Sequence, residues 1–226
     1  MIRLVLFDID GTLISAGGAG RHAIERAWKE VYGIPDCLAG VDLGGRTDAS
    51  LFEDMYRVHG IDLNPSMHQL FVSAYFHLLH ECLHVSDGSP LEGSSDFLNS
   101  LIGLYPDIVL GLLTGNARLA AEIKLRHFGL WDPFVLGAFG DDHACRDQLA
   151  TIAKGRGESF LGRELVGGEV LIVGDTLHDI QCARSIEAVC LAVATGGVSF
   201  DTLQGANPDY LVQSLAEVDA ETMVGR

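Results

Sequence analysis

Six short apolar runs constrain the fold of this chain more than any other feature of its sequence. Between most of them lie stretches in which apolar residues recur with helical spacing. Apolar strands that alternate with helices are typical of a parallel sheet covered by helices on both faces. The sequence therefore predicts an α/β fold with strands at 3–7, 108–113, 134–139, 170–173, 189–193 and 210–212, and with helices at 117–128, 146–156 and 179–187.

One long stretch interrupts this alternation. Between residues 15 and 89 no segment has the pattern of a convincing strand, whereas helical spacing recurs near 21–32, 48–59 and 65–84. We interpret the stretch as a helical insertion hinged at 17–20 and 87–90, where glycines gather. The core domain would then comprise 1–14 and 90–226, and the inserted helical domain 15–89. The alternative is that the extra helices pack rigidly on the sheet.

The composition excludes several classes of protein. With 48% hydrophobic residues the chain can bury a sizeable core, so it is not disordered. Its 15 basic and 31 acidic residues give a net charge of −16, which disfavours binding to nucleic acid or to an anionic membrane. An anionic substrate would need a metal ion or a few well-placed cations.

The sequence also indicates where the protein works. It has no apolar run near the ~18 residues that span a membrane, and its opening lacks a secretory apolar segment. The five cysteines form no CxxC pair, which is typical of reduced thiols. We therefore expect a soluble, cytoplasmic protein.

Two carboxylates follow the first apolar run directly. Asp8 and Asp10 stand where the buried strand would stop, and Gly11 permits a sharp turn. Such a strand end faces the usual ligand crevice of a parallel sheet, where close like charges raise a pKa or hold a cation. A solvated turn is the alternative interpretation.

Polar residues end two further apolar runs. Thr114, Gly115 and Asn116 follow the second run and could bind phosphate oxygens through backbone amides and the Thr hydroxyl, although Asn116 could equally cap a helix. Asp175 follows the run at 170–173, and Asp179 stands four residues on. In a parallel sheet these strand ends would converge on one crevice.

These segments resemble, in order and spacing, the first, second and fourth motifs of the haloacid dehalogenase (HAD) superfamily, in its phosphoglycolate phosphatase-like branch. The residues that carry the resemblance are Asp8-Ile9-Asp10-Gly11-Thr12, Thr114-Gly115-Asn116, and Gly174-Asp175 with Asp179. The resemblance implies a Rossmann-like, HAD-like core with an inserted helical cap.

The resemblance also implies a mechanism and a cofactor. Asp8 would be the nucleophile that forms an aspartyl-phosphate, and Asp10 the general acid and base. Mg²⁺ would be bound by Asp8, the backbone carbonyl of Asp10 and Asp175, with Asp179 holding a metal-bound water. Thr114 would take part in catalysis, with Gly115 and Asn116 binding the phosphate. Because dehalogenating members lack the second carboxylate, Asp10 favours phosphate esters.

The third motif of the family is not obvious in this chain. Its usual Lys, often Lys-Pro, is missing about 25 residues before Asp175. Arg146 and Lys154 are the candidates, and we favour Arg146 because it begins a predicted helix beside the crevice, whereas Lys154 lies about 12 Å further along that helix.

Two features of the insertion suggest binding sites. Gly45-Arg46-Thr47-Asp48 resembles an element of related caps, in which Arg46 would reach the substrate; a helix N-terminus with a solvated Arg46 is the alternative. His77, His80 and His84 share one helix face, but we expect exposed histidines there and no metal site, since zinc usually needs ligands from elsewhere too.

The sequence thus predicts a Mg²⁺-dependent phosphatase that acts on a small phosphorylated metabolite, phosphoglycolate-like by resemblance. The alternatives are a phosphomutase of the β-phosphoglucomutase kind and a non-catalytic, receiver-like module that binds Mg²⁺. Asp10 argues against the module, which needs no acid for a leaving group. The sequence predicts neither the exact substrate nor the oligomeric state.

Overall fold

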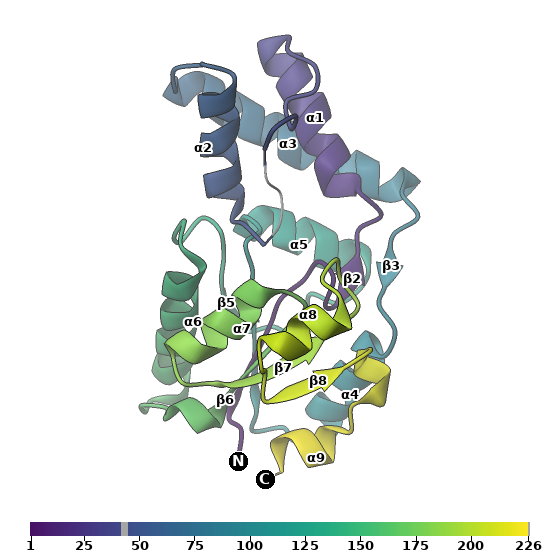
Figure 1. Cartoon of the computed structure of the whole chain (residues 1–226), viewed down its shortest axis with the longest axis vertical. Coiled ribbons are helices and arrows are strands. Elements are labelled where there is room, and N and C mark those ends of the chain that lie inside the picture. The colour runs from purple at the N-terminus through teal and green to yellow at the C-terminus, as the bar shows by residue number, and fades with distance from the viewer. Residues whose placement is uncertain (42–44, 226) are drawn as a thin grey trace.

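A six-stranded parallel sheet forms the centre of the molecule, as Figure 1 shows. The computed structural model describes residues 1–41 and 45–225. The strand order is β5-β4-β1-β6-β7-β8, and every neighbouring pair is parallel. The predicted α/β fold with a Rossmann-like parallel sheet is therefore confirmed.

The elements follow the predicted order. The strands of the sheet are β1 (Leu4–Phe7), β4 (Val109–Leu113), β5 (Leu136–Ala138), β6 (Val170–Gly174), β7 (Val189–Val193) and β8 (Tyr210–Val212). The helices outside the stretch 15–89 are α4 (Ser94–Leu104), α5 (Arg118–His127), α6 (Arg146–Leu161), α7 (Leu177–Ser185), α8 (Phe200–Gly205) and α9 (Ala220–Val224). Helices α5, α6 and α7 were predicted from the sequence, whereas α4, α8 and α9 were not.

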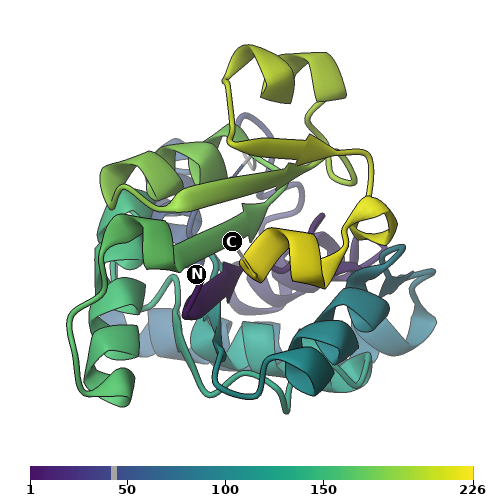
Figure 2. The same cartoon turned by 90° about the horizontal axis from the view of Figure 1, so that it is seen from below.

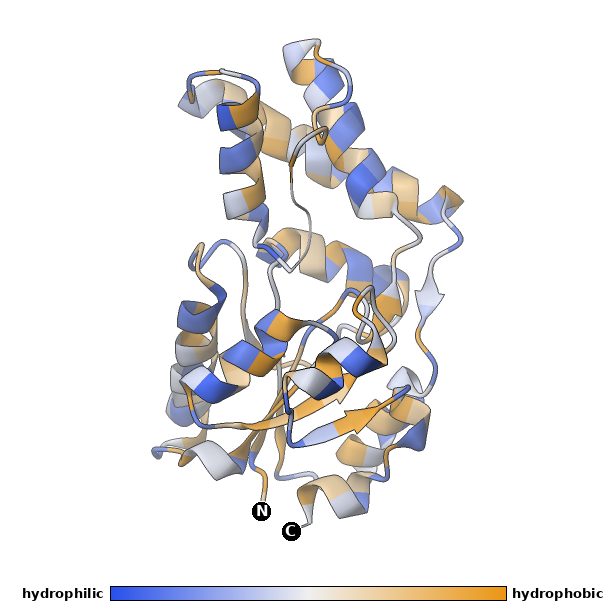
Figure 3. Cartoon of the chain, in the orientation of Figure 1, coloured by the Kyte–Doolittle hydropathy of each residue, from blue (hydrophilic) through white to orange (hydrophobic). Residues whose placement is uncertain are grey.

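The side chains of β1 explain the two layers of helices. Each of its four residues is buried, and their alternation sends Val5 and Phe7 to one face of the sheet and Leu4 and Leu6 to the other. The first face is covered by α4, α5 and α9, and the second by α6 and α7. The strands are accordingly hydrophobic along their length (Figure 3). Seen from below, the two layers enclose the sheet, and α9 lies beside the N-terminus (Figure 2).

The topology brings three strand ends together. Strand β1 lies between β4 and β6, and Phe7 is level with Leu112 on one side and Val173 on the other. The residues that follow each strand therefore emerge side by side at the carboxyl edge of the sheet, the usual position of ligands in such folds.

Three helices extend beyond this edge: α1 (Ala19–Tyr32), α2 (Asp48–Val58) and α3 (Pro65–Val85) (Figure 1). They share a separate hydrophobic cluster around Trp28, Phe71 and Tyr75, to which Ala117 and Ala120 at the start of α5 also belong. All three helices were predicted. That this segment is a domain of its own, bounded by residues 15 and 89, stays a prediction.

A two-stranded antiparallel ribbon joins the two ends of this segment. Strand β2 (Ile14–Ser15) pairs in antiparallel fashion with β3 (Ser89–Pro90). No strand was predicted here, because a run of two residues carries no periodicity. Within the described residues, no helix is both long and apolar enough to cross a membrane.

Candidate active site

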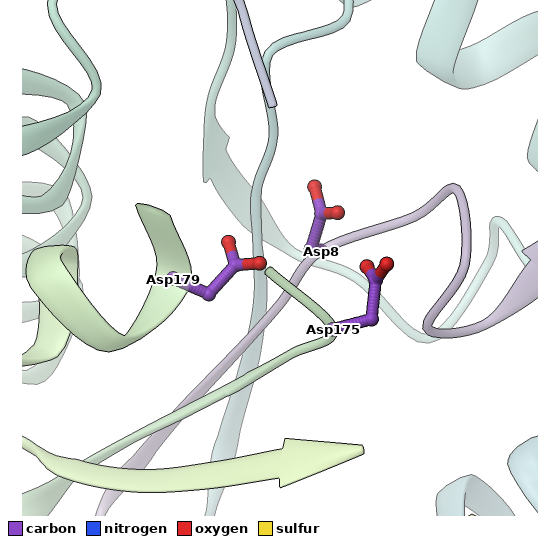
Figure 4. A group of neighbouring side chains, drawn as sticks. All are labelled: Asp8, Asp175 and Asp179. Atoms are coloured by element: carbon purple, nitrogen blue, oxygen red, sulfur yellow. The ribbon is translucent and has the colours of Figure 1, made fainter. Parts of the chain in front are cut away.

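Three buried carboxylates meet at the carboxyl edge of the sheet. Asp8 follows β1, Asp175 follows β6, and Asp179 lies in the first turn of α7, with one oxygen of each within 4.8 Å of the others (Figure 4). In the part of the chain that the structure describes, no other group of three His, Cys, Asp or Glu residues brings its ligand atoms this close. Oxygen donors of this kind suit Mg²⁺.

Burial makes this cluster electrostatically costly without a cation. Burial and the charge of Asp179 raise the pKa of Asp8 from 3.8 to about 7, although Arg146 opposes the shift. Burial and the charge of Asp8 raise the pKa of Asp175 from 3.8 to about 8. A divalent cation bound among the carboxylates would relieve their repulsion, so the residues present fit the metal that the sequence predicts.

Asp175 is held in place by the loop that follows β1. The hydroxyl of Thr12 donates a hydrogen bond to Oδ1 of Asp175 at 3.1 Å. Gly11 has a positive φ of 86°, and a Cβ atom at this residue would lie 2.5 Å from Oδ2 of Asp175. The glycine thus allows the two acidic loops to approach each other closely.

Asp179 has more protein partners than the other two carboxylates. Its Oδ2 accepts hydrogen bonds from the backbone N–H and hydroxyl of Thr176, at 3.0 and 2.6 Å, and its Oδ1 accepts one from Arg146. Fewer lone pairs are therefore left for a metal ion. The outer position of Asp179 around a metal ion stays a prediction.

Of the two candidate third-motif cations, the structure brings Arg146 to the site. Arg146 begins α6, and its Nη2 lies 2.6 Å from Oδ1 of Asp179 and 3.4 Å from Oδ1 of Asp8. Its Nε is buried without a hydrogen-bond partner among the described residues. Lys154, by contrast, approaches Glu158 on the same helix at 3.8 Å and does not line the cavity above the carboxylates.

The second predicted motif lies against Asp10. The Asn116 amide donates to Oδ2 of Asp10 at 2.8 Å and to the Thr114 hydroxyl at 2.9 Å. Gly115 follows Thr114 at the mouth of the cavity, where a Cβ atom would meet the main-chain oxygen of Arg46. The structure therefore brings Asp8, Asp10, Thr114, Gly115 and Asn116 to one cavity.

Lys124 is a member of the site that the sequence analysis missed. It is 5% exposed, and its ammonium donates to Oδ2 of Asp10 at 2.6 Å and to Oδ1 of Asn116 at 2.7 Å. A signal was present in the sequence: Lys124 falls on the apolar stripe of its helix, level with Ala117, Ala120 and Ala121. A cation on a buried helix face needs a nearby anion.

The three-helix segment covers this cavity, which has a volume of about 260 Å³. It is lined from this side by Arg21, Ile24, Leu38, Arg46, Leu51 and Tyr75. Arg46 is one of the lining residues, but its guanidinium also pairs with Asp54 and donates to the carbonyl of Ser50. The cover thus combines apolar side chains with cations.

The start of α2 rests directly on the second motif. The Asp48 backbone N–H donates to the carbonyl of Gly115 at 2.7 Å, and the Asp48 carboxylate accepts from the N–H of Ala117 at 2.8 Å. Thr47 caps α2 itself by accepting from Ser50. The segment 45–48 is therefore both a helix N-terminus and a contact with the phosphate-binding loop predicted from sequence.

Three histidines of α3, His77, His80 and His84, are exposed, as predicted. His77 lies 3.4 Å from Glu81, and Nδ1 of His84 lies 2.8 Å from the carbonyl of His80. None of the three belongs to the acidic group that could hold a metal ion.

A family comparison now identifies the fold and the class of chemistry. The model of the haloacid dehalogenase-like hydrolases matches residues 2–186. The chain belongs to this family. The predicted resemblance to HAD proteins is thus confirmed, and the protein is an enzyme of the hydrolase class.

Individual relatives of this HAD hydrolase are distant but match over nearly the whole chain. Pyrophosphatase PpaX of Halalkalibacterium halodurans is 25% identical, with 96% of this chain and 95% of the relative covered. Phosphoglycolate phosphatase of Yersinia pseudotuberculosis is 24% identical, with 96% and 91% covered. The crystal structure of a predicted phosphoglycolate phosphatase from Haemophilus somnus has a TM-score of 0.72 at 19% identity, with 96% of each chain covered.

Proposed function

We propose that this protein is a Mg²⁺-dependent phosphatase that hydrolyses a small phosphorylated metabolite through an aspartyl-phosphate intermediate. The observation that carries the proposal is the juxtaposition of Asp8 with Asp175 and Asp179 on one side and with Asp10 on the other. Asp8 and Asp175 supply carboxylate ligands for a cation, Asp179 lies beside them, and Asp10 supplies an acid next to the nucleophile. The phosphatase names of the relatives support the same reaction class.

The residues divide the reaction into two halves. A carboxylate oxygen of Asp8 attacks phosphorus, the bond from phosphorus to the leaving oxygen breaks, and Asp10 gives its proton to that oxygen. Asp10 then takes a proton from a water molecule, which attacks the aspartyl-phosphate and releases inorganic phosphate from Asp8. Bound Mg²⁺ would neutralise charge on the carboxylates and the phosphoryl group, held by Asp8, Asp175 and the backbone carbonyl of Asp10.

The remaining groups bind the phosphoryl oxygens. Thr114, Gly115, Asn116 and Arg146 line the same cavity as Asp8, and their hydroxyl, amide and guanidinium groups are the donors that we assign to the phosphoryl oxygens. They provide the local positive potential that an anionic substrate needs in a chain of net charge −16.

The cavity supports a small substrate. Its volume of about 260 Å³ suits a small phosphate ester, and Arg21 and Arg46 are among its lining residues. A compact phosphate ester with a second anionic group, such as 2-phosphoglycolate, matches these features. We further propose that residues 15–89 form a cap domain on the core at 1–14 and 90–226 and select the substrate.

Phosphate release from a panel of phosphorylated metabolites, with and without Mg²⁺, tests the function. We expect hydrolysis that requires Mg²⁺ and that falls at least about 10³-fold in Asp8→Asn, because no other carboxylate is placed to attack. Hydrolysis that survived Asp8→Asn in a phosphatase-free preparation would refute the assignment. A sugar bisphosphate intermediate with negligible phosphate release would identify the phosphomutase alternative instead.

A further inference from the structure

We propose that Lys124 is a positioning residue: with Asn116 it holds one oxygen of the Asp10 carboxyl group, so that the other oxygen faces the leaving group. The inference rests on the proposed phosphatase function, in which Asp10 is the proton donor. Lys124 belongs to none of the three motifs that were predicted from the sequence.

The three side chains form a closed hydrogen-bonded ring. Oδ2 of Asp10 accepts from the Lys124 ammonium at 2.6 Å and from the Asn116 amide at 2.8 Å. The ring closes through a third hydrogen bond, from the Lys124 ammonium to Oδ1 of Asn116 at 2.7 Å. Two donors on the same oxygen fix both the position and the rotation of the carboxyl group.

The other oxygen of Asp10, Oδ1, has no hydrogen-bond donor among the described residues, whereas Oδ2 has two donors. Oδ1 is therefore the oxygen from which a proton can move to the leaving oxygen as the bond to phosphorus breaks and the bond to Asp8 forms. The ammonium of Lys124 also neutralises the carboxylate that this transfer leaves on Asp10.

Burial distinguishes this pair from an ordinary surface ion pair. The side chain of Lys124 is 7% exposed and that of Asp10 is 41% exposed, so the lysine reaches the acid from inside the protein. Exposed pairs contribute little because solvent screens them and their side chains stay mobile. Lys124, by contrast, is fixed by the packing of α5 against the sheet and the three-helix segment.

Asn116 connects this ring to the phosphate-binding loop. Its amide nitrogen also donates to the Thr114 hydroxyl at 2.9 Å, so the acid, the lysine and the loop at 114–116 are one hydrogen-bonded unit. A change at Lys124 should therefore affect proton delivery first and phosphate binding less, because Thr114 keeps its own contact with Asn116.

A series of substituted phenyl phosphates tests the proposal. The substrates have almost the same shape, but 4-nitrophenolate leaves readily as an anion, whereas phenolate needs a proton. We expect Lys124→Met to lower kcat/KM for phenyl phosphate by about 10- to 100-fold and for 4-nitrophenyl phosphate by less than about 3-fold. The ratio kcat/KM is the right measure, since it reports the steps up to release of the phenolate and not the later hydrolysis at Asp8.

Matched variants separate positioning from general damage. Lys154→Met removes a lysine outside the cavity and should leave both substrates unchanged. Asp10→Asn should show the same selective loss as Lys124→Met, and the double variant should be no worse than Asp10→Asn alone, because the lysine acts only through the acid.

An equal loss on both substrates would overturn the proposal, and so would full activity of Lys124→Met on phenyl phosphate. Should Lys124→Met fail to fold by circular dichroism, Lys124→Arg answers the same question, because its planar head cannot take the place of the ammonium. A selective loss in that variant supports positioning, and an equal loss contradicts it. Failure of the proposed function itself has a different signature, since the unaltered protein would then hydrolyse neither substrate.

Discussion

Arg146 and Asp179 are joined by a hydrogen bond of 2.6 Å although 33 residues separate them in the sequence. The two side chains are 8% and 1% exposed, so the pair is shielded from water and salt. It links the first residue of α6 to the first turn of α7, and the same guanidinium reaches Asp8. This arginine therefore belongs both to the structural support of the acidic cluster and to its electrostatics.

Replacing Arg146 should harm both activity and stability. We expect Arg146→Met to lower kcat/KM by about 10²–10³-fold, because a cation beside the phosphoryl position is lost. Removal of one partner from a buried ion pair should also cost about 3–5 kcal/mol in the free energy of unfolding. Steady-state kinetics and urea denaturation measure the two effects. Lys154→Met is the matched control, and comparable losses there would favour Lys154 as the third-motif cation.

The metal-free protein should become less stable as the pH rises. Folding raises the pKa of Asp8 to about 7 and that of Asp175 to about 8, from 3.8 for each. The stabilisation from protonated carboxyls is thus fully present below about pH 4 and is lost as the pH rises through 7 and 8. In EDTA, the Tm should fall between pH 5 and pH 8.5, by about 2–4 °C for each kcal/mol lost. Asp175→Asn should make the Tm less dependent on pH. A Tm that rose between pH 5 and pH 8.5 would contradict the raised pKa values of Asp8 and Asp175.

Binding of Mg²⁺ should release protons near neutral pH. Because the pKa values of Asp8 and Asp175 lie at about 7 and 8, part of each carboxyl group is protonated at pH 7 and must lose its proton to bind a cation. Titration calorimetry in two buffers of different ionisation enthalpy measures the release. Asp175→Asn should weaken Mg²⁺ binding by about 10- to 100-fold or more. Asp201→Asn, at an exposed position in α8, is the control and should bind Mg²⁺ with the affinity of the unaltered protein.

A methyl group at Gly115 should separate the three-helix segment from the core. A Cβ atom there would clash with the main-chain oxygen of Arg46, so the start of α2 would have to move. We expect Gly115→Ala to lower kcat/KM by about 10- to 100-fold through misplacement of the cover and the phosphate loop. Gly155→Ala is the control, since a Cβ atom there meets no atom within 4 Å and should stabilise α6 by about 0.5–1 kcal/mol. Unchanged kinetics in Gly115→Ala would show that this contact is unimportant.

The part of the site built on strand ends could be predicted from sequence. An apolar strand has a readable end, and parallel strands all end at the same edge, so the positions of Asp8, Thr114 and Asp175 follow from where their strands stop. The six strands were found for the same reason. Strands β2 and β3, with two residues each, and the short helices α8 and α9 are too brief to produce a periodic pattern.

The contacts between helices and loops could not be predicted in this way. Lys124 and Asp10 are 114 residues apart: the apolar stripe of α5 indicates that Lys124 turns inward, but nothing local indicates which anion it meets. Asp48 likewise has the pattern of a residue in the first turn of its own helix, yet its carboxylate accepts the N–H of Ala117 at the start of another. Such pairings depend on how helices pack, which one sequence does not specify.

The antiparallel pairing of Ser15 with Ser89 has a consequence for engineering. The chain leaves the core and returns to it at adjacent points, so we expect the proposed cap at 15–89 to be exchangeable without a change in the strand register. A substitute of different size would leave β1 and β4 in place, provided that it covered Ala117 and Ala120 and replaced the contacts of Asp48 with the loop at 114–117. Because we propose that this segment selects the substrate, its replacement should change the selectivity while the carboxylate cluster beneath it stays in place.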